Sequence, residues 1–261
     1  RQVWLAVSDT LGASSYLLFN AESMPTLCFL QALLQSFFFV ASVLWSACIA
    51  HLLHRIVVAG ASMYSVKSMT LQYHPFVWGV ALLCTVPVAA TGHYGDSDGW
   101  CWITSGDHAD VIRFLSFYGI WAVSTAYMLW VCNSVTMRLR PHLAAPGAEG
   151  MEAVVFRLRL YPIISIAAWA PPAAFRVYQA LGGDGSAPLW LTAVGGCSGA
   201  LIGLLDSVAY GTTPPVKEAW RRWFAGASDS EGWTTGGIAA GGASFRHVTS
   251  DSNRTSTDAE G

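Results

Sequence analysis

The chain has 261 residues, of which 53% are hydrophobic and only 11% are charged, and its formal net charge is −2. This composition is too apolar for an ordinary soluble domain of this length, so a membrane protein is the first class to consider. A soluble helical protein with a large core is the alternative, but its helices would carry a polar stripe that the apolar runs of this chain mostly lack.

Six charge-poor runs follow one another, at residues 3–19, 25–50, 75–92, 114–137, 160–175 and 189–210. Each reaches or approaches the ~20 apolar residues that a helix needs to cross the hydrocarbon core. The sequence therefore predicts an all-α membrane protein whose residues 1–213 form a bundle of six transmembrane helices. Because the first run starts almost directly after Arg1, without a methionine or a flanking loop, we expect a further segment upstream.

Basic residues predict the orientation of this bundle, because cytoplasmic loops collect Lys and Arg. When the six runs alternate in direction, all but two of the basic residues fall on one side of the membrane. The basic residues on that side are Arg1, Arg55, Lys67, Arg138, Arg140, Arg157, Arg159, Lys217, Arg221, Arg222, Arg246 and Arg254. Only Arg113 and Arg176 fall on the other side. Both termini are therefore expected in the cytoplasm.

Two acids lie inside the predicted membrane helices, Asp9 in the first run and Asp206 near the inner end of the last. Ionisable groups in a membrane are costly and are kept mainly where they face the bundle interior. Both acids can share a polar network with Ser8, Ser207 and Tyr210. A structural pair and a functional pair fit the sequence equally well.

Six cysteines are present, and the four that pack inside apolar runs as small hydrophobic residues are Cys48, Cys84, Cys132 and Cys197. Cys28 and Cys101 are placed at the outer face, in an oxidising compartment. A disulfide between them is the economical interpretation, and two free thiols are the alternative. The bond would pin the outer loop "GWCWITSGD" across the bundle, with Trp100 and Trp102 as anchors at the membrane interface.

The fifth run contains Pro162, Pro171 and Pro172, each of which removes a backbone hydrogen bond and bends or loosens the helix. Trp169 lies just before the second of these prolines. A change of its rotamer can couple ligand contact outside to helix tilt inside, and simple packing of the indole is an equally good interpretation.

Arg176 and Tyr178 lie one to two turns beyond these prolines, toward the outer face, and Arg113 begins the fourth run at the same level. Two arginines there would suit an anionic ligand. We slightly favour the alternative, in which they form salt bridges with Asp107, Asp110 or Asp184.

The segment "PPVKEAWRRWF" at residues 214–224 places apolar side chains at helical spacing and cations on other faces. It predicts a short amphipathic helix in the membrane interface, with a solvated stub as the alternative. Residues 225–261 are rich in Gly, Ser, Thr and Asp, which predicts a disordered cytoplasmic tail.

Enzymatic motifs are absent, including phosphate-binding loops, nucleophile elbows and zinc-binding helices, so neither catalysis nor a cofactor or metal site is expected. Lys67 and Lys217 both fall outside the predicted membrane helices, which leaves no lysine for a retinal Schiff base. The bilayer is an expected partner, and nucleic acid is not.

Several stretches resemble a known family when they are taken in order: Cys28 with the outer-loop "CWI", then "AHLLHR", "YHPFVWG", "IRFLSFYG", "YPIISIAAWAPPAAFR" and "DSVAYG". Over about residues 1–224 the chain resembles the cyclic-AMP-receptor-like (class E) G-protein-coupled receptors of slime moulds and other protists. The resemblance implies a plasma-membrane receptor that binds an extracellular small molecule or peptide and activates a heterotrimeric G protein. The six runs would be helices two to seven of a seven-helix bundle.

The resemblance also implies roles for individual residues. Cys28 and Cys101 would form the family's disulfide. From the residues themselves, the expected ligand-binding residues are Trp102, Arg113, Arg176 and Tyr178. A conformational switch is expected to use Asp9, Trp169 and Pro171, together with Asp206 and Tyr210 of the "DSVAY" stretch. The expected G-protein contacts are His54, Arg55, Arg138, Arg140, Arg157 and Arg159.

Two departures from other receptors stand out. His54 and Leu53 precede Arg55, where other receptors often carry an acid, and "DSVAY" has no proline where N-P-x-x-Y is common. A transporter or channel is the rival class, but it predicts internal repeats and a polar path through the membrane, and no repeat is visible. A receptor fragment that does not signal is the third interpretation.

Overall fold

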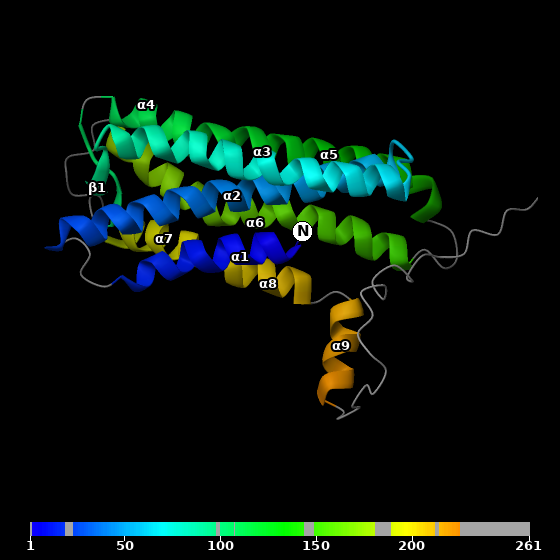
Figure 1. Cartoon of the computed structure of the whole chain (residues 1–261). Coiled ribbons are helices and arrows are strands. Elements are labelled where there is room, and N and C mark those ends of the chain that lie inside the picture. The colour runs from blue at the N-terminus through cyan, green and yellow to red at the C-terminus, as the bar shows by residue number, and fades with distance from the viewer. Residues whose placement is uncertain are drawn as a thin grey trace, which may run out of the picture. The chain divides into compact units, whose positions relative to one another are not determined.

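The computed structural model describes residues 2–18, 23–97, 100–106, 108–143, 149–180, 189–211 and 214–224. Helices dominate these residues (Figure 1). In chain order the elements are α1 (Gln2–Ser14), the 3-10 turn η1 (Ser15–Leu17), α2 (Pro25–Val57), α3 (Met63–Ala90), β1 (Tyr94–Asp96), β2 (Cys101–Ile103), α4 (Ala109–Arg113), the π-helical turn η3 (Phe114–Tyr118), α5 (Gly119–Leu143), α6 (Glu149–Ala180), α7 (Leu189–Ala200), α8 (Ile202–Gly211) and α9 (Pro214–Phe224).

Local sequence signals set several helix boundaries. Pro25 starts α2, a position where its missing N–H costs no helix hydrogen bond. Ser62 caps α3, since its hydroxyl oxygen accepts a hydrogen bond from the backbone N–H of Ser65 at 3.3 Å. Beyond α3, Gly92 has φ 71°, a left-handed conformation that glycine adopts without strain and that turns the chain toward β1.

Helix α2 is the centre of the bundle. It contacts α1, α3, α5, α6 and both strands. Its core includes the fully buried Trp45, and small residues such as Ala32 and Ala50 let the neighbouring helices approach closely. The site described below is therefore built around α2.

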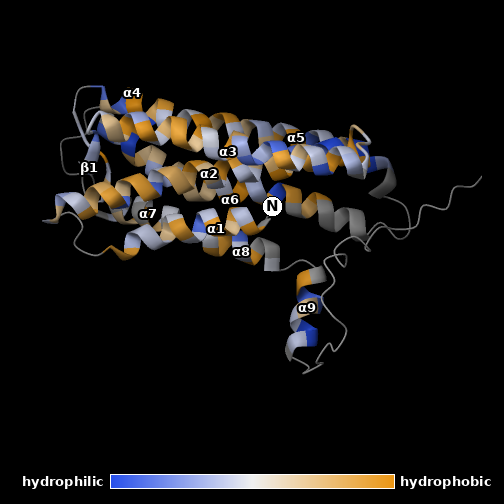
Figure 2. Cartoon of the chain, viewed as in Figure 1, coloured by the Kyte–Doolittle hydropathy of each residue, from blue (hydrophilic) through white to orange (hydrophobic). Residues whose placement is uncertain are grey.

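Three described helical segments are long and apolar enough to cross a membrane: Pro25–Val57, Tyr64–Ala90 and Ala109–Pro141. Figure 2 shows hydrophobic residues along the length of α2, α3 and α5. In α2, 56% of the most apolar stretch is buried inside the bundle. The corresponding shares are 22% for Tyr64–Ala90 and 28% for Ala109–Pro141. Such exposed apolar faces suit helices in contact with lipid.

The predicted helical runs agree with these elements over most of their described length. The last run divides at Leu201 into α7 and α8. The number of membrane spans, six, stays a prediction, because only three described segments meet the length and hydropathy that a span requires.

The two-stranded hairpin β1–β2 corrects the purely helical prediction. The strands pair antiparallel, with Tyr94 opposite Ile103 and Asp96 opposite Cys101. Each strand has only three residues, too few for the alternation that identifies a strand in a sequence. We call the end of the bundle at which this hairpin lies the hairpin end, and the opposite end the far end (Figure 1).

Residues Arg1–Val216 and Lys217–Gly261 form two separate units. Helix α9, which begins three residues before the second unit, is amphipathic as predicted, and Trp220 and Trp223 are 52% and 71% exposed. Glu218 accepts a hydrogen bond from Arg222 Nε at 3.3 Å, one turn away. The position of α9 in the membrane interface and the domain limits stay predictions, and the predicted tail at 225–261 lies outside the described residues.

Candidate functional site

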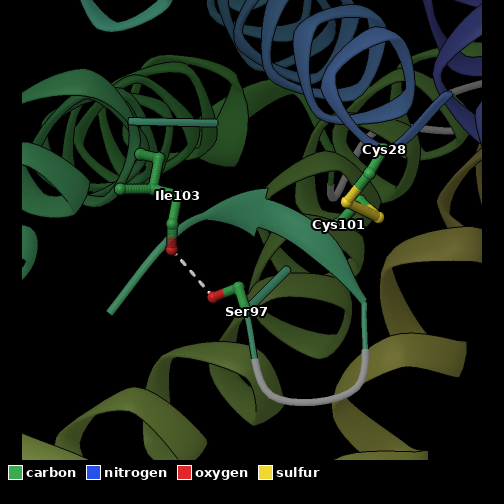
Figure 3. Close-up of a disulfide and its surroundings, with 4 residues drawn as sticks. All are labelled: Cys28, Ser97, Cys101 and Ile103. Atoms are coloured by element: carbon green, nitrogen blue, oxygen red, sulfur yellow. Dashed lines mark hydrogen bonds between the residues drawn. A yellow bond between two sulfur atoms is a disulfide. The ribbon is translucent and has the colours of Figure 1, made fainter. Parts of the chain in front are cut away.

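A disulfide ties the hairpin to the centre of the bundle. Cys101 on β2 is bonded to Cys28 in the first turn of α2 (Figure 3), and their Cα atoms are 5.1 Å apart. This separation lies within the range that disulfides require. The predicted disulfide is confirmed, and it links positions 73 residues apart in the sequence.

Tyr94 anchors the other strand of the hairpin. Its side chain is 7% exposed, and its ring packs edge-on against Phe29 of α2 with 6.1 Å between centroids. Burial raises the pKa of the Tyr94 phenol to about 12. The hairpin is thus fixed to α2 both covalently and by packing.

Two buried arginines from different helices converge on Ser97, which lies next to β1. Arg113, the last residue of α4, donates from Nη2 to Ser97 Oγ at 3.2 Å and to the backbone oxygen of Ile103 at 2.8 Å. Arg176 of α6 donates from Nη2 to Ser97 Oγ at 2.8 Å and to the Ser97 backbone oxygen at 3.1 Å. We call Ser97, Arg113 and Arg176 the arginine clamp.

The clamp is further stabilised from both sides. Ser97 Oγ donates to the Ile103 backbone oxygen at 2.8 Å (Figure 3), which closes the hairpin on itself. Arg113 Nη1 also pairs with Asp110 at 3.1 Å, one of the salt bridges that the sequence predicted. The other proposed partners, Asp107 and Asp184, lie outside the described residues.

Aromatic rings surround the Arg176 guanidinium. Its Cζ atom lies 4.8 Å from the ring centroid of Trp100, 5.6 Å from that of Trp102 and 5.0 Å from that of Phe175. Cation–π attraction of this kind is strongest where water is excluded, and Arg176 is only 4% exposed. Arg176 is therefore held between the hairpin and the bundle.

That Trp100 and Trp102 anchor the loop at the membrane interface stays a prediction, but Trp102 is buried and Trp100 is half-buried. Trp102 is 7% exposed, and its Nε1 donates to Ser36 Oγ of α2 at 3.1 Å. Its ring packs edge-on against Tyr118 at 5.6 Å. Trp102 belongs to the hydrophobic core, and the half-buried Trp100 packs against that core.

A small cavity of about 30 Å³ lies beneath the hairpin, and we call it the hairpin cavity. Polar and aromatic side chains from η1, α2, β2, η3 and α6 line it, among them Tyr16, Gln35, Ser36, Trp102, Tyr118 and Trp169. This volume has room for one or two water molecules. Gln35 Nε2 is buried and finds no hydrogen-bond acceptor in the described part of the chain, so it is a donor available to a guest.

Trp169 connects this cavity to several helices. It is 5% exposed, and its ring packs edge-on against Phe39 of α2 at 4.8 Å and Phe117 of η3 at 4.5 Å. A Cβ atom at Gly199 of α7 would lie 3.6 Å from Trp169 Cζ3, so α7 also approaches closely. A change in this indole would reach three neighbouring elements at once.

The π-helical turn η3 places Phe117 against Trp169. Single π-turns inside helices are rare and are often found at functional sites. Gly119 follows the turn, and a Cβ atom there would lie 2.9 Å from the Phe114 backbone oxygen. Glycine at this position is therefore required by the turn.

Asp9 of α1 and Asp206 of α8 are both buried, at most 9% exposed, and the two helices that carry them are in contact. Ser42 of α2 donates to Asp9 Oδ1 at 2.5 Å. A Cβ atom at Gly203 would lie 3.1 Å from Asp9 Cβ, so α8 and α1 are in close contact.

The predicted partners of this acid pair are placed differently. Ser8 and Ser207 donate to backbone oxygens of their own helices, at 2.9 Å and 2.6 Å. The side chain of Tyr210 lies outside the described residues. The sequence missed Ser42, because a serine in an apolar run carries no signal until the fold shows which helix faces Asp9.

The remaining predicted residues are spread over the bundle. Tyr178 is 40% exposed and is not among the described residues that line the hairpin cavity. Pro171 is half-buried, next to Pro172 at the cavity wall. His54 packs against Trp130 with 4.9 Å between ring centroids. The exposed basic residues on α2, α5 and α6 toward the far end are Arg55, Arg138, Arg140 and Arg159, and the side chain of Arg157 is outside the described part.

Comparison with known proteins identifies relatives of this chain. The family profile described as "Slime mold cyclic AMP receptor" matches residues 6–210. The protein "G-protein coupled receptor 1" of Arabidopsis thaliana is 31% identical over 229 residues, which cover 83% of this chain and 68% of that protein. "Cyclic AMP receptor 4" of Dictyostelium discoideum is 24% identical over 167 residues, 62% of this chain and 37% of that receptor.

"Cyclic AMP receptor 1" of the same organism is 25% identical over 158 residues, which cover 59% of this chain and 39% of that receptor. The chain thus spans between about two fifths and two thirds of the length of these relatives. The matched region includes the hairpin, the arginine clamp, the acid pair and Trp169.

Proposed function

The chain belongs to the slime mold cyclic AMP receptor family of G-protein-coupled receptors, and on this premise we propose that it binds a ligand at the hairpin end and activates a heterotrimeric G protein at the far end. Membership of this family also means a multi-pass membrane protein and favours a receptor over an enzyme. Plasma-membrane location and a cytoplasmic C-terminus are part of the proposal.

The hairpin cavity is the observation that carries this proposal. It lies under a disulfide-bonded hairpin and contains an unused donor, Gln35 Nε2, and its wall includes the indole of Trp169. A ligand larger than two water molecules needs more than the 30 Å³ present, so its binding requires the hairpin or the helices to move apart. Ligand binding would then select a second packing of the bundle.

The arginine clamp supplies the charge for an anionic ligand. Arg113 and Arg176 now donate to Ser97, and an anionic group of the ligand would replace Ser97 as their acceptor. Arginine forks suit phosphate and carboxylate groups, and two relatives carry the name cyclic AMP receptor. The proposal extends to an anionic small molecule, with Trp102 as an aromatic wall.

Transmission through the membrane would start at Trp169. Its indole contacts Phe39 and Phe117, and Pro171 and Pro172 follow it in α6, where each removes a helix hydrogen bond. Helices with such a weak point can change tilt. The Asp9–Asp206 pair between α1 and α8 is the second element that would rearrange.

The far end would receive the G protein. Arg55, Arg138, Arg140 and Arg159 are exposed there on three different helices. Basic residues at this end also agree with a cytoplasmic orientation. Movement of α6 relative to α2 and α5 would change the surface that these residues present.

Nucleotide exchange on a co-expressed heterotrimeric G protein tests the proposal, across a panel of anionic and neutral small molecules. We expect exchange with at least one anionic compound, and Arg55→Gln should reduce the maximal response without weakening ligand affinity. Lys67→Gln is the matched control. Lys67 is an exposed cation at the start of α3, a helix that carries none of the four arginines named above, so this variant should respond normally. Ligand-dependent solute flux without any exchange would favour a transporter instead.

A further inference from the structure

A second hollow lies on the side of the bundle, between α2, α3, η3 and the first part of α5. Its volume is about 910 Å³, close to the upper end of the range for small-molecule sites. The residues that form it belong to the three segments that are long and apolar enough to cross a membrane. We call this hollow the side groove.

The side groove opens onto the surface that faces lipid. Phe76 of α3 is 51% exposed, and Phe114, Leu115 and Val123 are 58%, 67% and 71% exposed. In a membrane such side chains border hydrocarbon, so the groove is continuous with the interior of the bilayer. Its occupant must therefore come from the membrane.

Polar groups gather at one end of the side groove only. His51 Nδ1 and the Tyr127 hydroxyl are hydrogen-bonded at 2.5 Å, and the His51 ring lies 6.1 Å from that of Tyr73. Gln72 lies beside them in the groove wall. Toward the hairpin end the wall is apolar, with residues such as Leu44 and Val80.

Charge excludes the common lipid headgroups. None of the described residues that line the side groove is Lys, Arg, Asp or Glu. A phosphate group would find no cation there, whereas a neutral hydroxyl can both donate to and accept from imidazole, phenol and amide groups. The ligand is therefore neutral with a small hydrogen-bonding head.

The length and width of the side groove indicate the shape of the rest of the ligand. From Phe114 to Tyr127 the groove follows thirteen residues of helix, about 20 Å at 1.5 Å per residue, which is shorter than one membrane crossing. Small residues, Ala47, Gly119 and Ala122, leave the groove broad between its aromatic edges. Such a space suits a broad, flat body.

The rigidity of the ligand distinguishes the neutral lipids that could occupy the side groove. Moving an apolar body from lipid into an apolar groove gains no hydrophobic free energy, so packing must exceed the entropy lost on ordering the ligand. A flexible acyl chain loses many rotamers, and a fused-ring body loses almost none. We propose that the side groove binds a membrane sterol, with its hydroxyl group at His51 and Tyr127 and its ring system between α3 and α5.

The test uses the whole chain in phosphatidylcholine nanodiscs that contain a photoreactive sterol, with the labelled peptides identified by mass spectrometry. We expect saturable labelling of the α3 and α5 segments that line the groove, displaced by unlabelled sterol and not by dioleoylglycerol. Ala122→Trp fills the groove and should weaken labelling by about tenfold or more. Leu83→Trp, at a 72% exposed position of α3 outside the groove, is the matched control and should label like the wild type.

A milder variant keeps the test decisive if Ala122→Trp does not fold. Tyr127→Phe removes one hydroxyl and should weaken sterol affinity by about fivefold, and a sterol hydrocarbon without the hydroxyl should bind wild type and variant equally. Equal displacement by dioleoylglycerol, equal labelling of the groove and of the Leu83 face, or unchanged affinity in both groove variants would overturn the proposal. None of these measurements depends on G-protein activation.

Discussion

The two hollows of the bundle are built in opposite ways. The hairpin cavity holds about 30 Å³, is lined largely by aromatic side chains and lies under a hairpin that a disulfide and two buried arginines hold in place, whereas the side groove holds about 910 Å³ and its rim is more than half exposed. A ligand of the first must displace contacts within the protein, while a ligand of the second only replaces lipid. Ligand binding in the hairpin cavity can therefore be coupled strongly to the packing of the helices. Ligand binding in the side groove needs a smaller conformational change of the protein.

The largest effect is expected from breaking the disulfide that ties the hairpin to α2. Cys28→Ser removes a bond between positions 73 residues apart, which should lower the free energy of unfolding by about 4 kcal/mol and the thermal midpoint by about 10 °C. Thermal unfolding in detergent measures this shift. Cys84→Ser, at a half-buried free thiol of α3, is the control, and an equal loss there would mean that the bond contributes nothing specific.

Removal of the indole at the cavity wall should have the next largest effect. Trp169→Ala leaves a void among Phe39, Phe117 and Gly199 and should cost about 3 kcal/mol. Trp130→Ala, at a residue that is 53% exposed, should cost less than about 1 kcal/mol in the same unfolding assay. Similar losses in both variants would show that burial does not distinguish the two tryptophans.

The arginine clamp should contribute less than the disulfide or the indole. Arg176→Gln removes a charge-assisted donor to Ser97 and should cost about 2 kcal/mol. Arg176→Lys keeps the charge but not the planar fork, so it should restore only part of the stability. A Lys variant as stable as the wild type would show that only the charge at this position matters.

The same two arginines should also be energetically coupled. Arg113 and Arg176 share the Ser97 hydroxyl as acceptor, so the double variant Arg113→Gln/Arg176→Gln should differ from the sum of the single variants by at least about 0.5 kcal/mol. A double-mutant cycle from unfolding data gives this number. Strict additivity would mean that the two arginines hold the hairpin independently.

The smallest effect is expected at the rim of the side groove. Leu115→Ala truncates a side chain that is 67% exposed to lipid and should change stability by less than about 0.5 kcal/mol, since lipid replaces the lost contacts. Leu158→Ala, at a residue only 2% exposed, should cost 2 kcal/mol or more, about the cost of a core truncation. Equal costs would mean that the groove rim is packed inside the protein and not against lipid.

The candidate site could be predicted in part from sequence. Cys28 and Cys101 were paired correctly, because the alternation of the apolar runs places both at the same end of the bundle. The sequence named Asp110 as one of three acidic partners for the two arginines, and Arg113 pairs with it. The burial of both arginines could not be predicted, because it depends on a hairpin whose two strands have only three residues each. Strands this short leave no recognisable pattern in the sequence.

Serine contacts show the same limit. Ser42 binds Asp9, and Ser97 binds Arg113 and Arg176, yet neither serine differs in the sequence from those that only bond their own helix, such as Ser8. Which serine faces a charge depends on helix rotation and on long-range contacts between α1, α2 and α6. Local spacing carries no information about either.

The sequence by itself determined the helical class, the approximate helix limits, the family and the disulfide, because these follow from local hydropathy, from the order of motifs and from two cysteines at one end. Only the tertiary structure decided that the tryptophans and arginines of the hairpin end turn inward, that Ser42 completes the acid pair and that the bundle carries a side groove. Side-chain direction and empty volume arise where several helices meet, and the physical cause is packing between segments that are distant in the chain.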